Sequence, residues 1–553
     1  MIDVPVLIAG GGPVGLSASL FLSRQGIRSL LVERHPGTSI LPKARGINAR
    51  TMEIYRQFGM EQAVRDAGLA PERTGLIVWT ESLAGREVER RVPGRMSPAN
   101  RAATAVPNCL CAQDDLEPVL RRFAAAETLA ELRFNTEMIE ARQDPDGVVA
   151  TLQDRVSGAE ILVRAQYLIA ADGAQSRVRR MMGARMIGQE GVYDSVNILF
   201  NADLRPWTAD RPAALYFVEQ SDLRATFLTI NASDRWGFLI HSLKHYGYTP
   251  ADFTPECCTA LIRKGVGVAD LPVRVLGVSA WEASAVVADR YRDARMFLAG
   301  DAAHEMPPTG GFGMNTGVQD VHNLAWKLAA VLHGQADAVL LDTYHAERQP
   351  IGVAITQASL ENSLSMGRTA RQDSAKLPRA AFLSEQGLIF GAAYESGAVV
   401  ADGTEAPVLD DPVTQYVPSA RPGCRAPHVW LRRDGAPVST VDLFGPRFVV
   451  LTGGRGGAWL DAARRLAGPS RPPLVAHMIG GDGALADGDG AWAAAYGVAD
   501  DGAVLVRPDG HVAWRSASRA DAPAQALQAA LDAVLGHGAV RSRDAHGPDE
   551  RRI

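Results

Sequence analysis

The amino-acid sequence predicts an α/β protein whose first domain is interrupted by a second one and followed by a separate C-terminal module. Short apolar runs over residues 4–9 and 28–33 flank a helical pattern, which is a βαβ unit. Alternating apolar stretches at 225–230 and 236–240 are typical of an antiparallel sheet. A further strand-and-helix pattern begins near residue 447. These three observations define the predicted architecture.

Two more apolar runs, 167–171 and 296–299, indicate that the first domain resumes after the interruption. Each run precedes a Gly/Asp motif and a helical pattern, as a buried parallel strand does. We therefore expect a separate sheet between about 185 and 285, and a helix over 350–370 that leaves this body.

The C-terminal module begins after a stretch rich in Pro, Gly and Asp at 405–425, which is typical of a domain boundary. We expect 480–502 to form a loop because it is rich in Gly, Ala and Asp, and 542–553 to be disordered because it is charged and contains Gly and Pro. The regular elements expected in this module are a strand at 447–452, a helix at 457–467 and strands at 503–506 and 511–514, the last two joined by the turn Arg507-Pro508-Asp509-Gly510.

Length and composition limit the class of protein. A chain of 553 residues predicts two or three domains. A net charge of −5 argues against nucleic-acid binding, and apolar runs too short to cross a membrane, with no basic N-terminal stretch, indicate a cytoplasmic protein. The five cysteines are odd in number and lack zinc-site spacing, so we expect neither a disulfide framework nor a bound metal.

A glycine-rich turn follows the first predicted strand. Gly10, Gly12 and Gly15 form a G-x-G-x-x-G fingerprint that allows a tight turn, a close approach to a pyrophosphate and close helix packing. The helix N-terminus that follows favours phosphate groups. Glu33 ends the second strand, where a carboxylate can accept hydrogen bonds from ribose hydroxyls. This turn predicts dinucleotide binding and leaves FAD and NAD equally open.

Two downstream motifs distinguish these cofactors through a family resemblance. One is Asp172-Gly173-Ala174-Gln175-Ser176-Arg177-Val178-Arg179. The other begins Gly300-Asp301-Ala302-Ala303-His304 and continues through Pro307-Pro308 and Gly310–Thr316 to Leu328. With the fingerprint, these motifs resemble those of the p-hydroxybenzoate hydroxylase-type flavoprotein monooxygenases over residues 4–350.

The resemblance implies FAD as the bound cofactor, NADPH or NADH as a transient reductant, and O2 as cosubstrate. A helix N-terminus near Met314 would also favour the negative charge of reduced flavin. The residues expected to bind the cofactor are Gly10, Gly12, Pro13, Val14, Gly15, Glu33, Arg34, Arg45, Gln113, Asp172, Gly173, Gly300, Asp301, Pro308, Gly311, Gly313, Met314 and Asn315.

The resemblance also implies that a flavin C4a-hydroperoxide delivers oxygen to an electron-rich aromatic carbon. Pro307, Pro308, Gly310 and Gly311 would line the reacting edge and exclude water. Candidate general bases are His241 and Tyr246, whereas we expect His304 to be structural. The side chains expected to stack on the substrate are those of Tyr216, Phe227, Trp236 and Phe238.

The C-terminal module resembles the thioredoxin-like extension of polycyclic aromatic (polyketide and indolocarbazole) hydroxylases. The matching segments are 421–428, 442–445 and 505–515, and the module lacks Cys-x-x-Cys. The resemblance implies a bulky, polyketide-like phenolic substrate of secondary metabolism, such as antibiotic biosynthesis. We expect a monomer or homodimer. The expected boundaries are FAD-binding segments 1–75, 101–182 and 286–400 (with linking helices), substrate-domain segments 76–100 and 183–285, a thioredoxin-like domain at 408–536 and a flexible tail at 537–553.

Other outcomes remain open at this point. The same flavin chemistry supports Baeyer–Villiger insertion or the steering of a reactive intermediate. The chain could also be a flavin dehydrogenase or reductase that inserts no oxygen, or a binding protein that retains FAD as structure.

Overall fold

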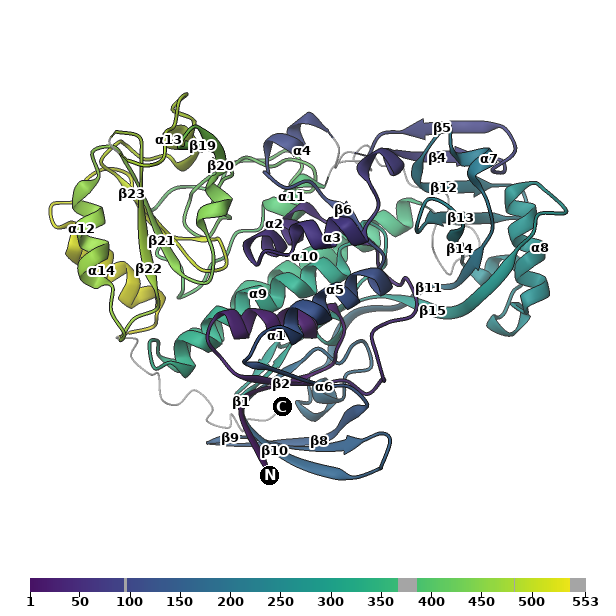
Figure 1. The fold of residues 1–553 in the computed structure, drawn as a ribbon, viewed down its shortest axis with the longest axis horizontal. Coiled ribbons are helices and arrows are strands. Elements are labelled where there is room, and N and C mark those ends of the chain that lie inside the picture. The colour runs from purple at the N-terminus through teal and green to yellow at the C-terminus, as the bar shows by residue number, and fades with distance from the viewer. Residues whose placement is uncertain (94–96, 367–384, 482, 538–553) are drawn as a thin grey trace, which may run out of the picture.

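The computed structural model describes residues 1–93, 97–366, 385–481 and 483–537. Figure 1 shows three bodies: a central one that contains both β1 and the long helix α9, a sheet-rich one with α8 on the right, and the C-terminal one on the left. The predicted α/β class with an interrupted first domain is confirmed.

The central sheet carries the βαβ unit predicted from the N-terminus. β1 (Ile2–Ala9) pairs in parallel with β2 (Ser29–Val32) and with β10 (Glu160–Ala170), and β10 pairs in parallel with β17 (Met296–Leu298). The carboxyl ends of these four strands therefore meet at one edge, although Ala9 of β1 and Met296 of β17 are 287 positions apart in the sequence. The remaining strands of this sheet are β7 (Ala130–Arg133), β8 (Thr136–Asp144), β9 (Gly147–Asp154) and β16 (Arg292–Asp293).

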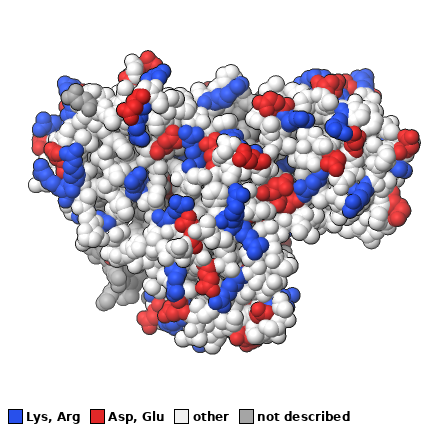
Figure 2. Space-filling model, in the orientation of Figure 1, with Lys and Arg blue, Asp and Glu red and all other residues white. Residues whose placement is uncertain are grey.

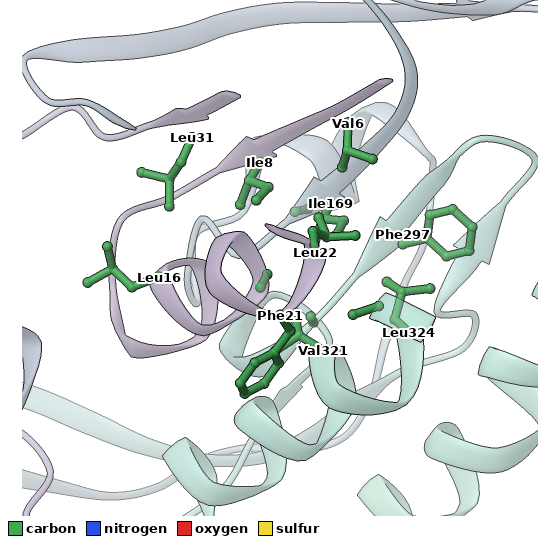
Figure 3. Packing of buried hydrophobic residues seen from close by; sticks show 14 of the residues in the cluster. Val6, Ile8, Leu16, Phe21, Leu22, Leu31, Ile169, Phe297, Val321 and Leu324 are labelled. Carbon is green, nitrogen blue, oxygen red and sulfur yellow. The ribbon is translucent and has the colours of Figure 1, made fainter. Parts of the chain in front are cut away.

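Helices α1 (Pro13–Arg24) and α9 (Gly313–Leu332) pack against this sheet. Apolar side chains at helical spacing in α1, including Leu16 and Phe21, are fully buried. Figure 3 shows Phe21 beside Val321 of α9. Each such side chain contributes about 1.5–3 kcal/mol by leaving water. This packing fixes the turn between β1 and α1 relative to the start of α9.

The second large sheet has the order β18-β15-β11-β14-β13-β12-β4-β5. Most of its pairings are antiparallel, as expected, but β12 and β4 are parallel, and β4 comes from the segment between β2 and β10. Helix α8 (Pro255–Val266) belongs to the same body (Figure 1). The strands are β4 (Leu76–Thr80), β5 (Glu87–Arg91), β11 (Met186–Asn201), β12 (Ala213–Glu219), β13 (Arg224–Thr229), β14 (Arg235–His241), β15 (Arg274–Ala288) and β18 (His304–Glu305).

In the part of the chain that the structure describes, the remaining α-helices before residue 391 are one long helix and seven shorter ones. α10 (Asp342–Ser365) begins eight residues before the expected 350, with Pro350 inside it, and the expected residues 367–370 lie outside the described chain. The shorter helices are α2 (Ala49–Gln57), α3 (Glu61–Ala67), α4 (Pro98–Ala102), α5 (Gln113–Ala125), α6 (Arg177–Met181), α7 (Arg205–Thr208) and α11 (Gln386–Phe390).

The C-terminal body is a four-stranded sheet of order β22-β21-β23-β24. The expectation of a loop over 480–502 is wrong in part, since α13 (Ala491–Tyr496) forms there around the buried Trp492. The predicted disorder at 542–553 falls outside the described residues. The other elements are β19 (Trp430–Arg433), β20 (Ala436–Ser439), β21 (Phe448–Gly453), α12 (Gly457–Leu466), β22 (Leu474–Ile479), β23 (Ala503–Val506), β24 (Val512–Ser516) and α14 (Pro523–Val534).

Within the described residues, none of the helices combines the length and apolar character needed to cross a membrane. Figure 2 shows that acidic and basic side chains are interspersed over the visible face rather than gathered by sign.

Candidate active site

One cavity joins the central sheet to the second sheet. Its volume is about 1250 Å³, and it extends from the turn after β1, past the loop before α9, to side chains of β12, β13 and β14. Pockets for a single drug-sized ligand have volumes of about 300–1,000 Å³. The cavity is therefore large enough for a dinucleotide together with a second molecule.

The turn between β1 and α1 has the backbone that the fingerprint predicts. Gly10 has φ +107°, and a Cβ there would lie 2.2 Å from the Ala171 carbonyl oxygen. A Cβ on Gly15 would lie 1.9 Å from the Gly10 carbonyl oxygen, so only glycine allows the helix to approach this closely. Gly12 precedes the first turn of α1, and no side chain caps that turn. Its amide groups remain available to a phosphate.

Glu33 follows β2 and closes this end of the cavity. Its Oε2 accepts a hydrogen bond from the Gly11 amide at 2.7 Å, and its Oε1 accepts one from the His35 amide at 2.9 Å. The carboxylate retains acceptor capacity for ribose hydroxyls because each oxygen carries two lone pairs. Arg34 lines the same end.

The loop before α9 forms the opposite wall. The side chain of Asp301 faces the cavity, and protein surrounds the cavity at this point. This enclosure raises the pKa of Asp301, whereas His304 and Lys43 lower it. Gly311 has φ +69° and open space around its Cα, which allows a flat ring to approach the backbone. Pro308, Gly310, Gly313 and Met314 line the same wall.

Asp172 offers a buried oxygen at the edge of the cavity. Its Oδ2 accepts hydrogen bonds from the amides of Arg177 (2.8 Å) and Val178 (3.4 Å) at the start of α6. Within the described residues its Oδ1 is buried without a hydrogen-bond partner, and this burial raises the pKa of the side chain. A buried acceptor without a partner is costly in an empty protein, so it fits a site that a polar ligand fills. Gly173 lies beside it.

Arg45 and Gln113 line the cavity, and Arg45 also connects the bodies that carry the two sheets. The Arg45 guanidinium donates to the carbonyls of Thr229 (2.8 Å) and Ala214 (2.7 Å) in the second sheet. Gln113 opens α5 and accepts from the Ala44 amide at 3.3 Å. The sequence-based prediction assigned these residues to the flavin phosphates and missed this contact between domains.

Four of the residues predicted to bind the cofactor or to line the reacting edge do not line the cavity. Gly15 and Gly300 instead allow close backbone packing, since a Cβ on Gly300 would lie 2.9 Å from Val14. Pro307 is buried, whereas Pro308 is exposed to the cavity. Asn315 donates to the carbonyls of Gly46 (2.8 Å) and Gly311 (2.7 Å), which supports the loop from behind. The prediction that they touch the cofactor or substrate is corrected to a supporting role.

The prediction of substrate-stacking aromatic residues is wrong. Tyr216, Phe227, Trp236 and Phe238 all point to the far face of the second sheet, where they are buried in its hydrophobic core. Side chains alternate between the faces of a strand, so their neighbours face the cavity. The cavity-facing residues of these strands are Leu215, Phe217, Thr226, Leu228, Leu239 and His241.

Only one of the two candidate general bases lines the cavity. His241 lines the cavity, and its Nδ1 lies 2.7 Å from Ser195 Oγ. Tyr246 is not among the lining residues, and burial raises its pKa, which disfavours a role as a base at neutral pH. His304 is fully buried and lies 2.9 Å from Asp320, as a structural role requires.

Two family models match the chain. A FAD-binding domain matches residues 3–359, and the C-terminal domain of aromatic-ring hydroxylases matches residues 419–538. A putative polyketide hydroxylase of Streptomyces halstedii is 41% identical, with 96% of each chain covered. The tetracenomycin A2 monooxygenase-dioxygenase of Streptomyces glaucescens is also 41% identical, with 96% of this chain and 97% of the relative covered.

Solved structures agree over almost the whole length. The flavin-dependent monooxygenase PieE, in complex with FAD and substrate, superposes with a TM-score of 0.89 at 36% identity, covering 97% of this chain and 99% of that one. Aklavinone-11 hydroxylase, in complex with FAD and aklavinone, gives a TM-score of 0.88 at 35% identity with the same coverage. The glycine turn, the unpartnered Asp172 oxygen and the large cavity fit FAD in this chain as well, and the chain belongs to the FAD-dependent aromatic-ring hydroxylase family of monooxygenases.

Proposed function

We propose that this enzyme uses NAD(P)H and O2 to hydroxylate a bulky, polycyclic, phenolic substrate of the polyketide type. The observation that supports this most directly is the continuous cavity that runs from the dinucleotide turn to an apolar sheet face. When bound, FAD supplies the transfer of electrons from the nicotinamide to O2. The oligomeric state stays the sequence-based prediction of a monomer or homodimer.

The cofactor end of the cavity supplies binding and charge. The amides at the start of α1 would hold the pyrophosphate, and Glu33 would accept from a ribose. Asp301 would accept from the ribityl chain. The N-terminus of α9, at Gly313, would place positive potential beside the flavin ring, which stabilises the reduced, anionic form.

The substrate end supplies shape and exclusion of water. Leu215, Leu228 and Leu239 form an apolar wall, and Phe217 adds an aromatic surface. Such a wall is complementary to the flat faces of fused rings. It would orient the substrate through apolar contact area rather than through hydrogen bonds. Pro308 and Gly311 on the opposite side would bring the flavin edge near and exclude water from the reacting carbon. His241 is the polar side chain on this wall best placed to meet a phenol.

The proposal is tested with the purified holoenzyme and the substrates named for its relatives, tetracenomycin A2 and aklavinone, together with simpler polycyclic phenols. The expected result is faster NAD(P)H oxidation with one of them and a product heavier by one oxygen atom, labelled when 18O2 is supplied. Ring opening or expansion in the product would favour the Baeyer–Villiger alternative. Nicotinamide oxidation that yields only H2O2 with every compound would favour a reductase and overturn the proposal.

A further inference from the structure

A buried carboxylate behind the cavity fixes the turn that carries Asp301. Asp320 of α9 is fully buried, and its Oδ2 accepts from the Gly300 amide at 3.1 Å and lies 2.9 Å from His304 Nε2. These partners are the first and last residues of the turn. Burial would raise the pKa of Asp320, but the charge of Arg348 and the hydrogen bonds to the carboxylate lower it, so the carboxylate remains ionised. The position of Asp301 therefore depends on Asp320.

Arg348 of α10 holds the same carboxylate from the other side. Its Nε donates to Asp320 Oδ1 at 2.8 Å, and its Nη2 donates to the Thr316 carbonyl at 3.2 Å. Its Nη1 donates to the Tyr394 hydroxyl at 3.1 Å. A planar guanidinium that meets three separate acceptors in a buried site has one orientation. Movement of Tyr394 would therefore be transmitted to Asp320.

The C-terminal domain contacts this group through its turn at 507–511. The His511 ring stacks on Tyr394 with centroids 4.1 Å apart and an angle of 28°. Asp509 of the same turn accepts from Asn323 (3.1 Å) and from the Trp326 indole (3.2 Å), both on α9. The turn is thus packed against the two helices that carry Asp320 and Arg348, and it is as buried as a domain core.

We propose that the turn 507–511 of the C-terminal domain is a positioning part of the active site, which holds the turn Gly300–His304 in place through Tyr394, Arg348 and Asp320. The C-terminal domain then sets how Asp301 meets the cofactor. This inference rests on the FAD assignment and is independent of the substrate's identity. A domain that only added stability would leave the local order of residues 300–304 unchanged in the folded holoenzyme.

The test removes the Tyr394 hydroxyl, which is one link in the contacts from His511 through Arg348 to Asp320. Tyr394→Phe deletes the acceptor of Arg348 but keeps the ring that stacks on His511. Tyr496→Phe is the matched control, because its buried hydroxyl donates to the Pro427 carbonyl at 2.8 Å inside the C-terminal domain, away from Asp320. The two readouts are hydrogen exchange of peptides covering residues 299–304 in the holoenzyme and the FAD dissociation constant.

Tyr394→Phe should speed exchange at 299–304 and weaken FAD binding about 10-fold, within the range by which residues on a coupling path act. Tyr496→Phe should change neither while lowering thermal stability to a similar extent. His511→Ala, which removes the stacked ring from the C-terminal side, should reproduce the first result. The proposal is overturned if both tyrosine variants behave alike, or if His511→Ala leaves residues 299–304 as protected as in the unsubstituted protein.

Discussion

The buried ion cluster between α9, α10 and the C-terminal domain allows a quantitative prediction for Glu347→Gln. The Glu347 carboxylate accepts from Arg507 Nη1 (2.6 Å) and Nη2 (2.8 Å), from Lys327 Nζ (2.7 Å) and from Asn323 Nδ2 (2.7 Å). Burial would raise the pKa of Glu347, but the charges of Arg507 and Lys327 lower it well below its usual range. The side chain is therefore an anion at every pH at which the protein is handled.

The magnitude follows from the charge balance. Lys327, Arg507, Glu347 and Asp509 are two cations and two anions, all buried, so the substitution leaves an uncompensated positive charge in the interior. Removing one partner of a buried pair costs about 3–5 kcal/mol. The glutamine amide also places an NH2 donor among groups that are themselves all hydrogen-bond donors. This mismatch remains even when the amide oxygen faces Arg507. We expect a loss of about 3–5 kcal/mol in the free energy of unfolding.

The loss should depend on pH, because Lys327 can give up its proton. Burial lowers the pKa of Lys327 to about 8, against the attraction of Glu347. Without Glu347 this pKa falls further below the unfolded value of about 10.4. A depressed lysine pKa adds stability as pH rises, and in the variant this gain starts at lower pH. The difference between the two proteins should therefore shrink between about pH 6 and pH 8.

The assay is urea unfolding of the holoenzyme, followed by circular dichroism at about pH 6, 7 and 8. Asp500→Asn is the control, because Asp500 pairs with Arg455 at 3.0 Å and both side chains are largely exposed, so its loss should not exceed about 1 kcal/mol. A Glu347→Gln loss no larger than that of Asp500→Asn, or one that grows as the pH is raised over this range, would refute this account of the cluster.

Three further predictions concern the cavity and its surroundings. Phe238→Ala should cost about 3–5 kcal/mol of stability because Phe238 is fully buried in the core, whereas Leu239→Ala, on the cavity face, should raise the substrate KM and leave the urea midpoint nearly unchanged. Gly15→Ala should abolish retention of FAD on gel filtration, since its Cβ would lie 1.9 Å from the Gly10 oxygen; a yellow, stoichiometric variant would contradict this. Burial and the charge of Asp301 raise the pKa of Glu305 from 4.5 to about 7, so its contribution to stability is present below pH 4.5 and is lost as pH rises through 7. Glu305→Gln should therefore be more stable than the natural protein in urea unfolding above about pH 7, by no more than about 1–2 kcal/mol because solvent screens this half-buried side chain. The same advantage persisting undiminished near about pH 4 would contradict this assignment.

The backbone turns at the proposed cofactor end of the site could be predicted from sequence because their signals are local. Gly10 and Gly15 lie within six residues, and one turn sets both the positive φ of Gly10 and the close approach at Gly15 that require glycine. Asp172 and Asp301 each follow a strand of the same parallel sheet, so their convergence follows from the rule that strand ends meet at one edge. The same rule does not distinguish a lining residue from one just behind it, as Gly300 illustrates.

The substrate end was mispredicted because a strand's side chains change face at every residue. Tyr216, Phe227 and Phe238 pair directly across three strands, so the sequence contains the information that they share a face. Which face is the core depends on the position of α8, whose Gly265 packs against Phe227 and Phe238. The packing of α8 on these strands joins segments that share no local sequence pattern. The prediction therefore relied on the size and aromaticity of side chains, and it selected residues of the core face.

The way the chain is interrupted explains why one family can act on different substrates. β10 ends at the edge where the cofactor turns gather, and the chain then builds most of the second sheet before returning through β17 to the same edge. The inserted sheet is therefore placed over the cofactor by its two connections, whatever side chains its cavity face carries. Substitutions at Leu215, Thr226 or Leu239 would reshape the proposed substrate wall without altering the residues proposed to hold the cofactor. Substrate preference should therefore change with these positions, while FAD affinity should follow Asp320, Arg348 and the turn at 507–511.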